Sequence, residues 1–473
     1  MIGGLKSYAE YKDSRLPWLG TIPKHWEVRR NGRLFLQRNE TGFPDLPILE
    51  VSLKTGVRVR DFDNSTRKQV MSVREKYKRA RQGDIAYNMM RMWQGAVGVA
   101  PVDGLISPAY IVAKPLPETD SRYYGYLYRI GAYKDEVNKF SRGIVSDRNR
   151  LYWEDFKQMP SPFPPPDEQA AIVRFLDHAD RRIRRYIRAK RQLISLLNEQ
   201  KQAIIHRAVT RGLDPNVRHK PSGVEWLGDV PEHCDVWQIG HLARVGNGST
   251  PSRGTPEYWA NRSYPWLNSS SVNQSTITSA DQFVTPLALV ECHLPRVQPG
   301  SVLVAITGQG KTRGTAARLM SEATINQDIA YITPRRKDVT QDFLYLALTA
   351  AYAELRKISD DAGSTKGALT CGDLKHFRIP VPPVDEQVVL FNSVENETSR
   401  ASQLANHLED EIKLITEYRT RLIADVVTGK LDVREAAARL PDELDDGDAE
   451  ELIEDEGVVD DAEFDAEPEE VEV

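Results

Sequence analysis

Two long stretches of the chain carry apolar residues at alternating spacings of three and four. Each opens with the motif DEQ after a proline cluster and closes on Leu-Asp. The first runs from Asp167 to Asp214, and the second runs from Asp385 to Asp432, 218 positions later. The apolar positions are Ile172, Leu176, Ala179, Ile183, Tyr186, Leu193, Leu197 and Ile204 in the first stretch, and Val394, Ala401, Leu404, Leu408, Ile415, Tyr418 and Leu422 in the second. This spacing predicts two long helices with a coiled-coil seam in a duplicated chain.

The start of each predicted helix follows from its sequence. The prolines at 164–166 favour a helix that begins directly after them. Asp167 and Glu168 then stand in the first turn, where the helix dipole favours negative charge. At 1.5 Å per residue, a helix of roughly 44 residues spans about 66 Å.

The two predicted helices carry opposite charge. The first holds the basic run RRIRRYIRAKR over residues 181–191. The acidic residues of the second are Glu409, Asp410, Glu411 and Glu417. Complementary charges beside the seam select partner and direction in coiled coils. We therefore expect antiparallel pairing, with Arg184 and Arg185 opposite Asp410 and Glu409 when the centres are aligned. The alternative is two separate solvated helices.

Shorter β-prone runs, separated by turns, precede each long helix and indicate two globular units. The predicted strands lie at 48–53, 84–89, 109–114 and 301–307, and the predicted helices lie at 123–140 and 342–357. The second unit is about ten residues longer than the first, because the repeat offset grows from 208 to 218 along it.

A proline-rich and glycine-rich lead-in comes before each unit. The pattern WLGxxPxH occurs at 18–25 and again at 226–233. We expect an extended segment with little regular structure. His25 and His233 are predicted to seat this loop and not to act in catalysis, because no acid or nucleophile stands at a matching spacing.

These patterns predict an α+β fold with a pseudo-twofold internal repeat. Two mixed α/β domains are expected to be separated and joined by two long antiparallel helices. The expected segments are 1–160 (lead-in and first domain), 161–214 (first helix), 215–380 (lead-in and second domain), 381–435 (second helix) and 436–473 (an acidic, disordered tail).

Charge distribution points to a polyanionic partner. The chain of 473 residues has a net charge of −5, but residues 441–473 hold 18 acidic residues and no basic residue. Without them the remaining 440 residues carry +13, which suits double-stranded DNA. The three cysteines lack metal-ligand spacing, and no stretch has the length and apolarity of a membrane span. We expect a soluble cytoplasmic protein without a metal site.

Candidate DNA contacts are basic, amide and aromatic side chains gathered in four turn-rich segments. Arg, Asn and Gln can make bidentate contacts to base edges, whereas Lys mostly meets phosphate. The alternative for each segment is a solvated charged face. The candidates are Arg58, Arg60, Arg67, Lys68, Asn88, Arg91, Trp93, Gln94, Arg253, Tyr258, Gln309, Lys311 and Arg313.

One motif resembles a nucleotide-binding loop. The sequence AITGQGKT, from Ala305 to Thr312, fits a relaxed Walker A pattern. No convincing partner strand ending in a metal-binding Asp accompanies it, and the first unit has no equivalent motif. NTP binding and a purely structural coiled-coil adaptor are the alternatives to a DNA-reading role. No catalytic signature of an amino-methyl transferase or nuclease is found, so we expect no catalytic residues and no bound cofactor in this chain.

The arrangement resembles the specificity subunit of Type I restriction–modification systems. The resemblance rests on PPPDEQAAI and VPPVDEQVVL, the two WLGxxPxH lead-ins, GDIAYNMMRMWQGAVG with SPAYIV, and STPSRGTPEYW, and it covers residues 1 to about 435. The acidic tail departs from the family pattern.

The resemblance implies a function and a set of partners. Two target recognition domains would each read one half of a split DNA site, and the helices would space the halves and dock two modification subunits. Those subunits would methylate adenine with S-adenosylmethionine. Restriction subunits would add translocation and cleavage that depend on ATP and Mg. The chain itself would be a non-catalytic subunit of this restriction system.

Overall fold

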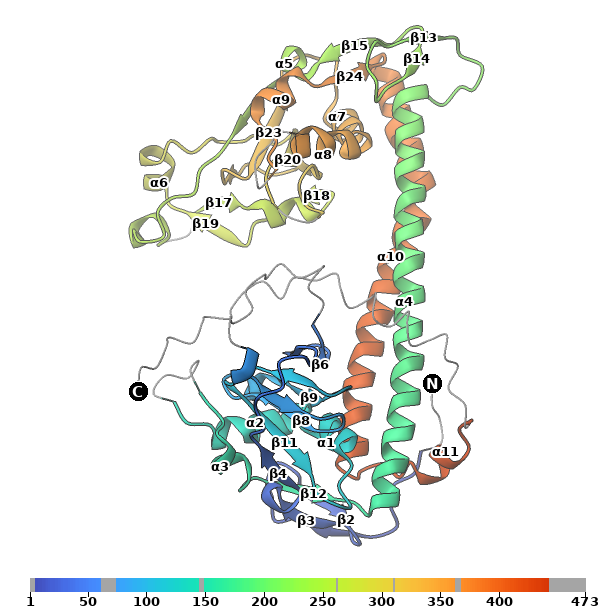
Figure 1. Cartoon of the computed structure of the whole chain (residues 1–473). Helices are drawn as coiled ribbons and strands as arrows, with labels where there is room; N and C mark the ends of the chain where they lie inside the picture. Colours follow the sequence, from blue (N-terminus) through green and yellow to red (C-terminus); the bar gives the residue numbers. More distant parts are fainter. Residues whose placement is uncertain are drawn as a thin grey trace. The chain divides into compact units, whose positions relative to one another are not determined.

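The computed structural model describes residues 5–60, 74–143, 149–260, 263–308, 311–361 and 367–441. It divides into two compact units (Figure 1). Unit 1 comprises Met1–Lys190 and Asp410–Val473, and unit 2 comprises Arg191–Glu409. The chain passes between the units at 190/191 and again at 409/410. These two boundaries lie 219 positions apart, within one residue of the 218-residue sequence repeat. Each unit therefore contains one end of each long helix.

The core of unit 1 is a four-stranded antiparallel sheet in the order β4-β11-β8-β9. Its strands are β4 (Phe35–Arg38), β8 (Ile85–Asn88), β9 (Val97–Val99) and β11 (Tyr110–Pro115). The smaller pairs around it are β1 (Tyr11–Asp13) with β2 (Thr21–Pro23), β3 (Glu27–Arg30) with β12 (Pro160–Phe163), β5 (Leu49–Ser52) with β6 (Gly56–Val59), and β7 (Lys78–Ala80) with β10 (Gly104–Ile106). The lead-in is thus more regular than predicted, because its short strands pair.

Unit 2 repeats this sheet and extends it. The order β16-β23-β20-β21-β18 begins with the same four positions as in unit 1. The strands are β16 (Ala243–Asn247), β18 (Thr276–Ile277), β20 (Ser301–Ala305), β21 (Ala316–Leu319) and β23 (Ile329–Pro334). The accompanying strands are β13 (His219–Pro221), β14 (Asp229–Pro231), β15 (Asp235–Gln238), β17 (Tyr264–Leu267), β19 (Gln282–Val284), β22 (Thr324–Ile325) and β24 (Arg378–Val381). The predicted internal repeat is confirmed at the level of strand order.

Short helices accompany the sheets in both units. Unit 1 has α1 (Ser121–Leu127), α2 (Gly131–Phe140) and α3 (Trp153–Phe156). Unit 2 has α5 (Ile239–Leu242), α6 (Pro286–Glu291), α7 (Gln341–Ala350), α8 (Tyr352–Asp361) and α9 (Cys371–His376). The helices predicted at 123–140 and 342–357 are each two shorter helices, since the chain turns between α1 and α2 and between α7 and α8.

The long helices are α4 (Pro166–Arg211) and α10 (Val384–Val427), followed by α11 (Arg434–Ala438). In each unit a stretch of α4 lies antiparallel beside a stretch of α10 (Figure 1). Equivalent residues of the two helices enter the two cores: Ile172 and Leu176 in unit 1, and Leu390 and Val394 in unit 2. The predicted boundary between helix and tail, at 435/436, falls inside α11, and residues 442–473 lie outside the described residues.

The predicted register of the helix pair is wrong. With the centres aligned, Lys190 would face Leu404, whereas its Nζ contacts Glu411 Oε2 at 2.5 Å. Asp180 likewise binds Arg419 of α10 as well as Arg184 of its own helix, whereas the centred register would place Asp180 opposite Leu414. In unit 1, apolar residues of both helices, among them Leu176 and Leu422, enter the same core, and this packing accompanies the observed register.

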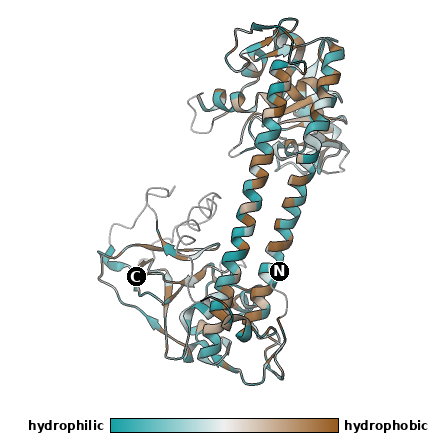
Figure 2. Cartoon of the chain, turned by 90° about the vertical axis from the view of Figure 1, so that its right-hand side faces the viewer, coloured by the Kyte–Doolittle hydropathy of each residue, from teal (hydrophilic) through white to brown (hydrophobic). Residues whose placement is uncertain are grey.

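The predicted apolar seam is buried only in part. Ile183 and Leu408 are buried, but Tyr186, Leu193 and Leu404 are 52%, 41% and 42% exposed. Two helices alone cover only a narrow stripe of one another, and the sheets cover just the helix ends. Figure 2 shows hydrophobic positions on the face of the helices that is turned to the viewer.

The DEQ motifs fasten each long helix to its domain through the same contacts. Gln169 is fully buried; its Oε1 accepts the Asp120 N–H, and its Nε2 donates to the carbonyls of Pro164 and Glu118 at 2.8 and 3.1 Å. Gln387 repeats this with the Thr340 N–H and the carbonyls of Pro382 and Asp338. The amide of each glutamine therefore fixes the angle at which the helix leaves its domain.

The lead-in histidines contact the neighbouring glutamates of these motifs. His25 Nε2 lies 2.7 Å from Glu168 Oε2, and His233 Nε2 lies 2.7 Å from Glu386 Oε2. Tyr8 also donates to the buried Glu168. The prediction that both histidines seat the lead-in is confirmed, although the acids that they contact stand more than 140 positions away in the sequence.

Candidate nucleic-acid interface

Two hairpin loops occupy the same position in the two units. The first joins β8 to β9 and carries the turn Met92–Gln94; the second joins β20 to β21. Each loop ends on a glycine with positive φ, Gly95 at +99° and Gly314 at +85°. A left-handed conformation favours glycine at both positions because other residues meet steric strain there. The two loops are therefore topological equivalents with different sequences.

A second segment runs beside each loop. In unit 1 the Leu151 N–H donates to the Met89 carbonyl at 2.9 Å. In unit 2 the Leu369 N–H donates to the Ile306 carbonyl at 2.8 Å. Sequence reasoning overlooked these segments. In unit 1 the segment brings Arg142 and Arg150, which are bridged to one another through their backbones, close to the β8–β9 loop. The run FSRGIVSDRNR, with three arginines, was the available signal.

The unit 1 loop holds two polar side chains in a fixed arrangement through a hydrogen bond between them. Arg91 Nε donates to Gln94 Oε1 at 2.8 Å, and both side chains are half-buried. Trp93 is also half-buried, and its Nε1 donates to the Met90 carbonyl at 3.0 Å. These bonds restrict the rotamers of three predicted contacts, which lowers the entropy lost when they meet a ligand.

Two predicted contacts need correction. Asn88 is 3% exposed, and its Oδ1 accepts the Met90 N–H at 3.0 Å, so it shapes the turn after β8. Arg313 is 7% exposed; it donates to the Gly367 carbonyl at 2.6 Å and binds Asp360. Its guanidinium ties the β20–β21 loop to the neighbouring segment. The burial of both side chains favours a structural role over contact with bases.

Lys311 remains a candidate in the unit 2 loop. Its side chain is exposed, while its carbonyl accepts the hydroxyl of Tyr352 at 2.8 Å. This bond anchors the backbone and leaves the ammonium group at the surface. Three other predicted contacts, Arg67, Lys68 and Gln309, lie outside the described residues.

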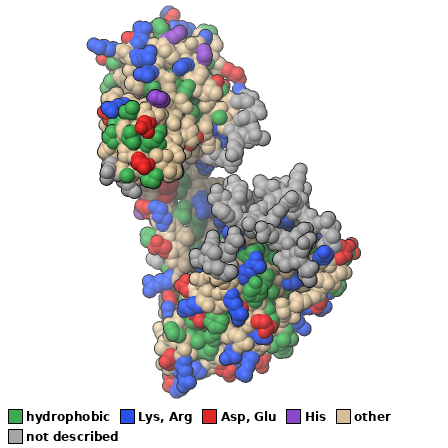
Figure 3. Space-filling model, turned by 90° about the vertical axis from the view of Figure 1, so that its left-hand side faces the viewer, with side chains coloured by type: hydrophobic (Ala, Val, Ile, Leu, Met, Phe, Trp, Pro, Cys, Tyr) green, Lys and Arg blue, Asp and Glu red, His purple; other side chains and the backbone are tan. Residues whose placement is uncertain are grey.

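Strand β6 and the residue directly after it supply two more candidates. Arg58 is half exposed, and its Nε donates to Glu50 Oε1 on the paired strand β5 at 2.6 Å. Arg60 is half-buried, and its backbone N–H donates to the Ile48 carbonyl at 2.8 Å. Figure 3 shows Lys and Arg side chains over both units on the face in view. An exposed cross-strand ion pair such as Arg58–Glu50 is worth little and can exchange for a phosphate.

The other unit 2 candidates form an aromatic platform. The guanidinium of the exposed Arg253 lies 3.7 Å from the ring centroid of Trp259 and 5.4 Å from that of Trp266, and it donates to Gln282 Oε1 at 2.7 Å. Tyr258 donates to Glu291 at 2.8 Å, and this bond, with burial, raises the pKa of Tyr258 to about 12. Stacking holds the guanidinium flat, in the geometry that suits bidentate recognition.

The loop that resembles Walker A has the wrong surroundings for nucleotide binding. In a phosphate-binding loop the strand leads into a helix, whose N-terminal amide groups cradle the phosphates. Here β20 leads through Gly308 and Lys311 into the antiparallel strand β21. The loop is thus a β-hairpin turn.

A metal centre and a membrane span are both absent from the described part of the chain. Across residues 5–441, apart from the gaps given above, no group of three or more His, Cys, Asp or Glu side chains could hold a metal ion. In the same residues no helix combines the length and apolarity needed to cross a bilayer.

The fold places the chain among proteins built from two mixed α/β domains and two long helices, and comparisons with known proteins show which family it is similar to. The family model of the Type I restriction modification DNA specificity domain matches residues 231–414. The Escherichia coli EcoR124I/EcoR124II specificity subunit is 21% identical over 285 residues, which are 59% of this chain and 64% of the relative. This chain therefore covers slightly less than two thirds of that relative's length.

Two further similarities cover most of the chain. The Methanocaldococcus jannaschii protein called a putative Type I restriction enzyme MjaX specificity subunit is 21% identical over 435 residues, 88% of this chain and 96% of the relative. A solved structure from work on assembly and conformational transition of the type I R-M system has a TM-score of 0.60 at 16% identity, covering 87% of this chain and 99% of that one. The predicted resemblance to Type I specificity subunits is confirmed by the family model over residues 231–414 and by these relatives.

Proposed function

We propose that this chain reads a bipartite DNA sequence as the specificity subunit of a Type I restriction–modification complex. The observation that carries the proposal is the pair of equivalent hairpin loops, β8–β9 and β20–β21, which hold different basic and amide side chains on the same framework. A duplicated framework with divergent loops suits two half-sites of different sequence. The basic body of the chain supplies the attraction for phosphate.

The two alternative functions, NTP binding and a structural adaptor, explain fewer features of the chain. An NTP-binding role needs a loop that leads into a helix, and the Ala305–Thr312 segment leads into a strand. A structural adaptor explains the long helices, but it leaves the excess of 13 positive charges in residues 1–440 without a purpose.

The chemistry of the complex would come from its partners. The relatives are named specificity subunits of Type I restriction enzymes. By analogy, modification subunits with S-adenosylmethionine would methylate adenine, and restriction subunits with ATP and Mg would translocate and cleave DNA. This chain would contribute sequence recognition and assembly without catalytic residues or a cofactor of its own.

Methylation mapping tests the proposed function. When the chain is expressed with its modification subunit in a host without adenine methylation, methylated adenines should fall in one asymmetric bipartite sequence. Sequencing that detects modified bases gives the result directly. The modification subunit expressed alone is the control, and methylation that is absent or unrelated to sequence would contradict the proposal.

The exposed apolar residues of the long helices support docking of two modification subunits. Tyr186 and Leu414 in unit 1 are 52% and 65% exposed. Their repeat equivalents in unit 2, Leu404 and Leu196, are 42% and 54% exposed. Exposed large apolar side chains mark interaction surfaces when they recur together. The same pair in both units suits two copies of one partner, one copy for each pair.

Acidic substitutions should separate the two docking events. We expect Leu414→Asp or Leu196→Asp to leave a complex with one modification subunit, and the double variant to leave none, because each carboxylate would be buried unpaired in the interface. Native mass spectrometry of the co-purified complex measures the composition. Gln192→Asp, an exposed position on the same helix, is the matched control. Two bound subunits in the double variant would contradict this assignment.

A further inference from the structure

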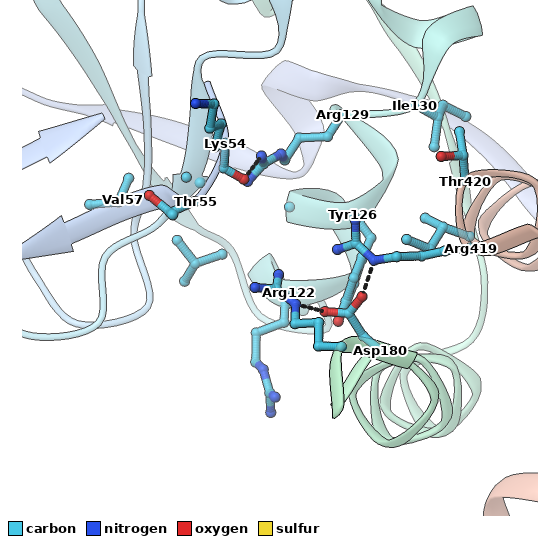
Figure 4. Close-up of a pocket in the computed structure, with 16 residues that line it drawn as sticks. Lys54, Thr55, Val57, Arg122, Tyr126, Arg129, Ile130, Asp180, Arg419 and Thr420 are labelled. Carbon is cyan, nitrogen blue, oxygen red and sulfur yellow. Dashed lines mark hydrogen bonds and ion pairs between the residues drawn. The ribbon is translucent and has the colours of Figure 1, made fainter. Parts of the chain in front are cut away.

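A pocket of about 380 Å³ opens in unit 1 between the recognition domain and the long helices (Figure 4). Its walls come from the β5–β6 turn, strand β9, helix α1 and one face each of α4 and α10. The residues that line it include Lys54, Gly56, Gly98, Arg122, Arg129 and Asp180, with Arg184, Arg419 and Thr420 from the long helices.

The lining is strongly basic. It contains five cationic side chains, Lys54, Arg122, Arg129, Arg184 and Arg419, against one carboxylate, Asp180. Burial alone would raise the pKa of Asp180, but its hydrogen bond to Arg419 and the charges of Arg419 and Arg184 lower it. The carboxylate is therefore ionised, and with Asp177, which binds Arg122 beside the pocket, five cations still face only two carboxylates. Such an excess of positive charge in a concave site attracts an anion.

The arginines of the pocket are held in place. Arg184 Nε donates to Asp180 Oδ2 at 2.8 Å, and Arg419 binds the other oxygen of the same carboxylate. Arg129 donates to the Leu53 carbonyl at 2.8 Å and to the carbonyl of Lys54, which fixes the β5–β6 turn (Figure 4). A ligand would meet guanidinium groups that are already ordered, at a low cost in side-chain entropy.

Glycines keep two walls of the pocket close together. A Cβ on Gly98 would lie 2.5 Å from the Val57 nitrogen, so β6 and β9 approach more closely than side chains would allow. A Cβ on Gly125 would lie 3.2 Å from a methyl carbon of Val99. Substitution of either glycine would push these walls apart or fill the space between them.

The pocket adjoins a strand that carries candidate DNA contacts. Gly56 and Val57 line it, and Arg58 and Arg60 follow directly on the same segment. We propose that this pocket binds one phosphate of the DNA backbone next to the half-site that unit 1 reads. This inference rests on the proposed function and adds a sequence-independent contact to it. Guanidinium forks match phosphate oxygens in geometry and charge.

Substitutions at Thr420 test the pocket without removing any of its arginines. The Thr420 side chain is exposed on the pocket wall, and its hydroxyl donates to the Thr416 carbonyl within α10 at 3.0 Å. Thr420→Glu should weaken binding of specific and unrelated duplexes by the same factor. The slope of log affinity against log salt should fall by about 0.9, the value for one lost phosphate contact. Thr420→Lys should tighten binding, a gain that misfolding cannot produce.

Two matched control variants separate the effect of a charge in the pocket from the effects of side-chain size and of charge elsewhere on the helices. Thr420→Gln changes the size of the side chain without adding a charge and should bind like the wild type. Gln202→Glu places the same charge at the repeat-equivalent position of α4 in unit 2, outside this pocket, and should leave the salt slope unchanged. All measurements use the full chain in complex with its modification subunits.

The outcomes are distinct. Equal affinity and slope for Thr420→Glu and the wild type would overturn the pocket proposal. Calorimetry with ATP tests a free nucleotide as the other source of phosphate; binding that Thr420→Glu abolishes while DNA affinity stays unchanged would also overturn it. If the wild-type complex fails to prefer any DNA sequence, the proposed function fails, whatever the variants at Thr420 do.

Discussion

Arg91→Ala is expected to relax recognition in one half of the DNA site and to leave the other half unchanged. Arg91 and Gln94 are joined in the β8–β9 loop of unit 1, and the two side chains are of the kinds that bond base edges in pairs. Loss of one bidentate contact costs about 1–3 kcal/mol of discrimination against the wrong base. Methylation mapping of the variant complex would show which positions of the site tolerate new bases.

Arg253→Ala in unit 2 is the reciprocal variant. Its guanidinium is stacked on Trp259 in the other domain, so its loss should relax the opposite half of the site.

Arg58→Ala is expected to weaken both specific and non-specific binding without a change in the site, because an exposed arginine on a strand edge suits phosphate contact. Loss of discrimination in both halves from Arg91→Ala alone would argue against independent reading.

A seven-residue insertion made at the same level in both long helices is expected to lengthen the spacer between the half-sites. A heptad keeps the apolar pattern in register and adds about 10 Å of helix. DNA rises 3.4 Å per base pair, so the spacer should grow by up to about three base pairs. The contact between Lys190 and Glu411 identifies the level, since insertions after Lys190 and after Asp410 shift both helices together. The half-site sequences should not change.

The same insertion carries a rotational cost. Three base pairs turn the duplex by about a third of a turn, at 10–10.5 base pairs per turn, so the binding affinity should fall even when the spacer grows. Insertion in one helix alone is the control; it displaces one end of α4 or α10 from its domain core and should destabilise that unit. A preserved spacer with normal activity in the double insertion would show that the helices do not set the distance.

Several features of the fold were readable from sequence because they depend on local patterns. The repeat offset of 218 predicted two equivalent units, and their sheets have the same strand order. The strands predicted at 84–89 and 301–307 are β8 and β20. The long helices were visible in the spacing of apolar residues, since a helix exposes the same face every three to four positions. Charge placement indicated a basic body without any structural knowledge.

The roles of individual side chains could not be read in this way. Asn88 and Lys311 both stand in polar, turn-rich segments, yet Asn88 is buried in a turn and Lys311 is exposed. Gln169 looked like one polar residue of a motif, and it is the residue that fixes α4 to its domain. Such differences depend on neighbours that lie far away in the chain.

The sequence by itself determined that the chain is duplicated, that two long helices alternate with two mixed α/β domains, and that the body carries an excess of positive charge. Only the tertiary structure decided the register of the helix pair, the pairing of His25 with Glu168, the burial of Arg313 and the basic pocket beside β6. The physical reason is the separation in sequence between the residues that determine each property. Periodicity and net charge are properties of neighbouring residues, whereas burial and hydrogen bonding join residues that only the folded chain brings together.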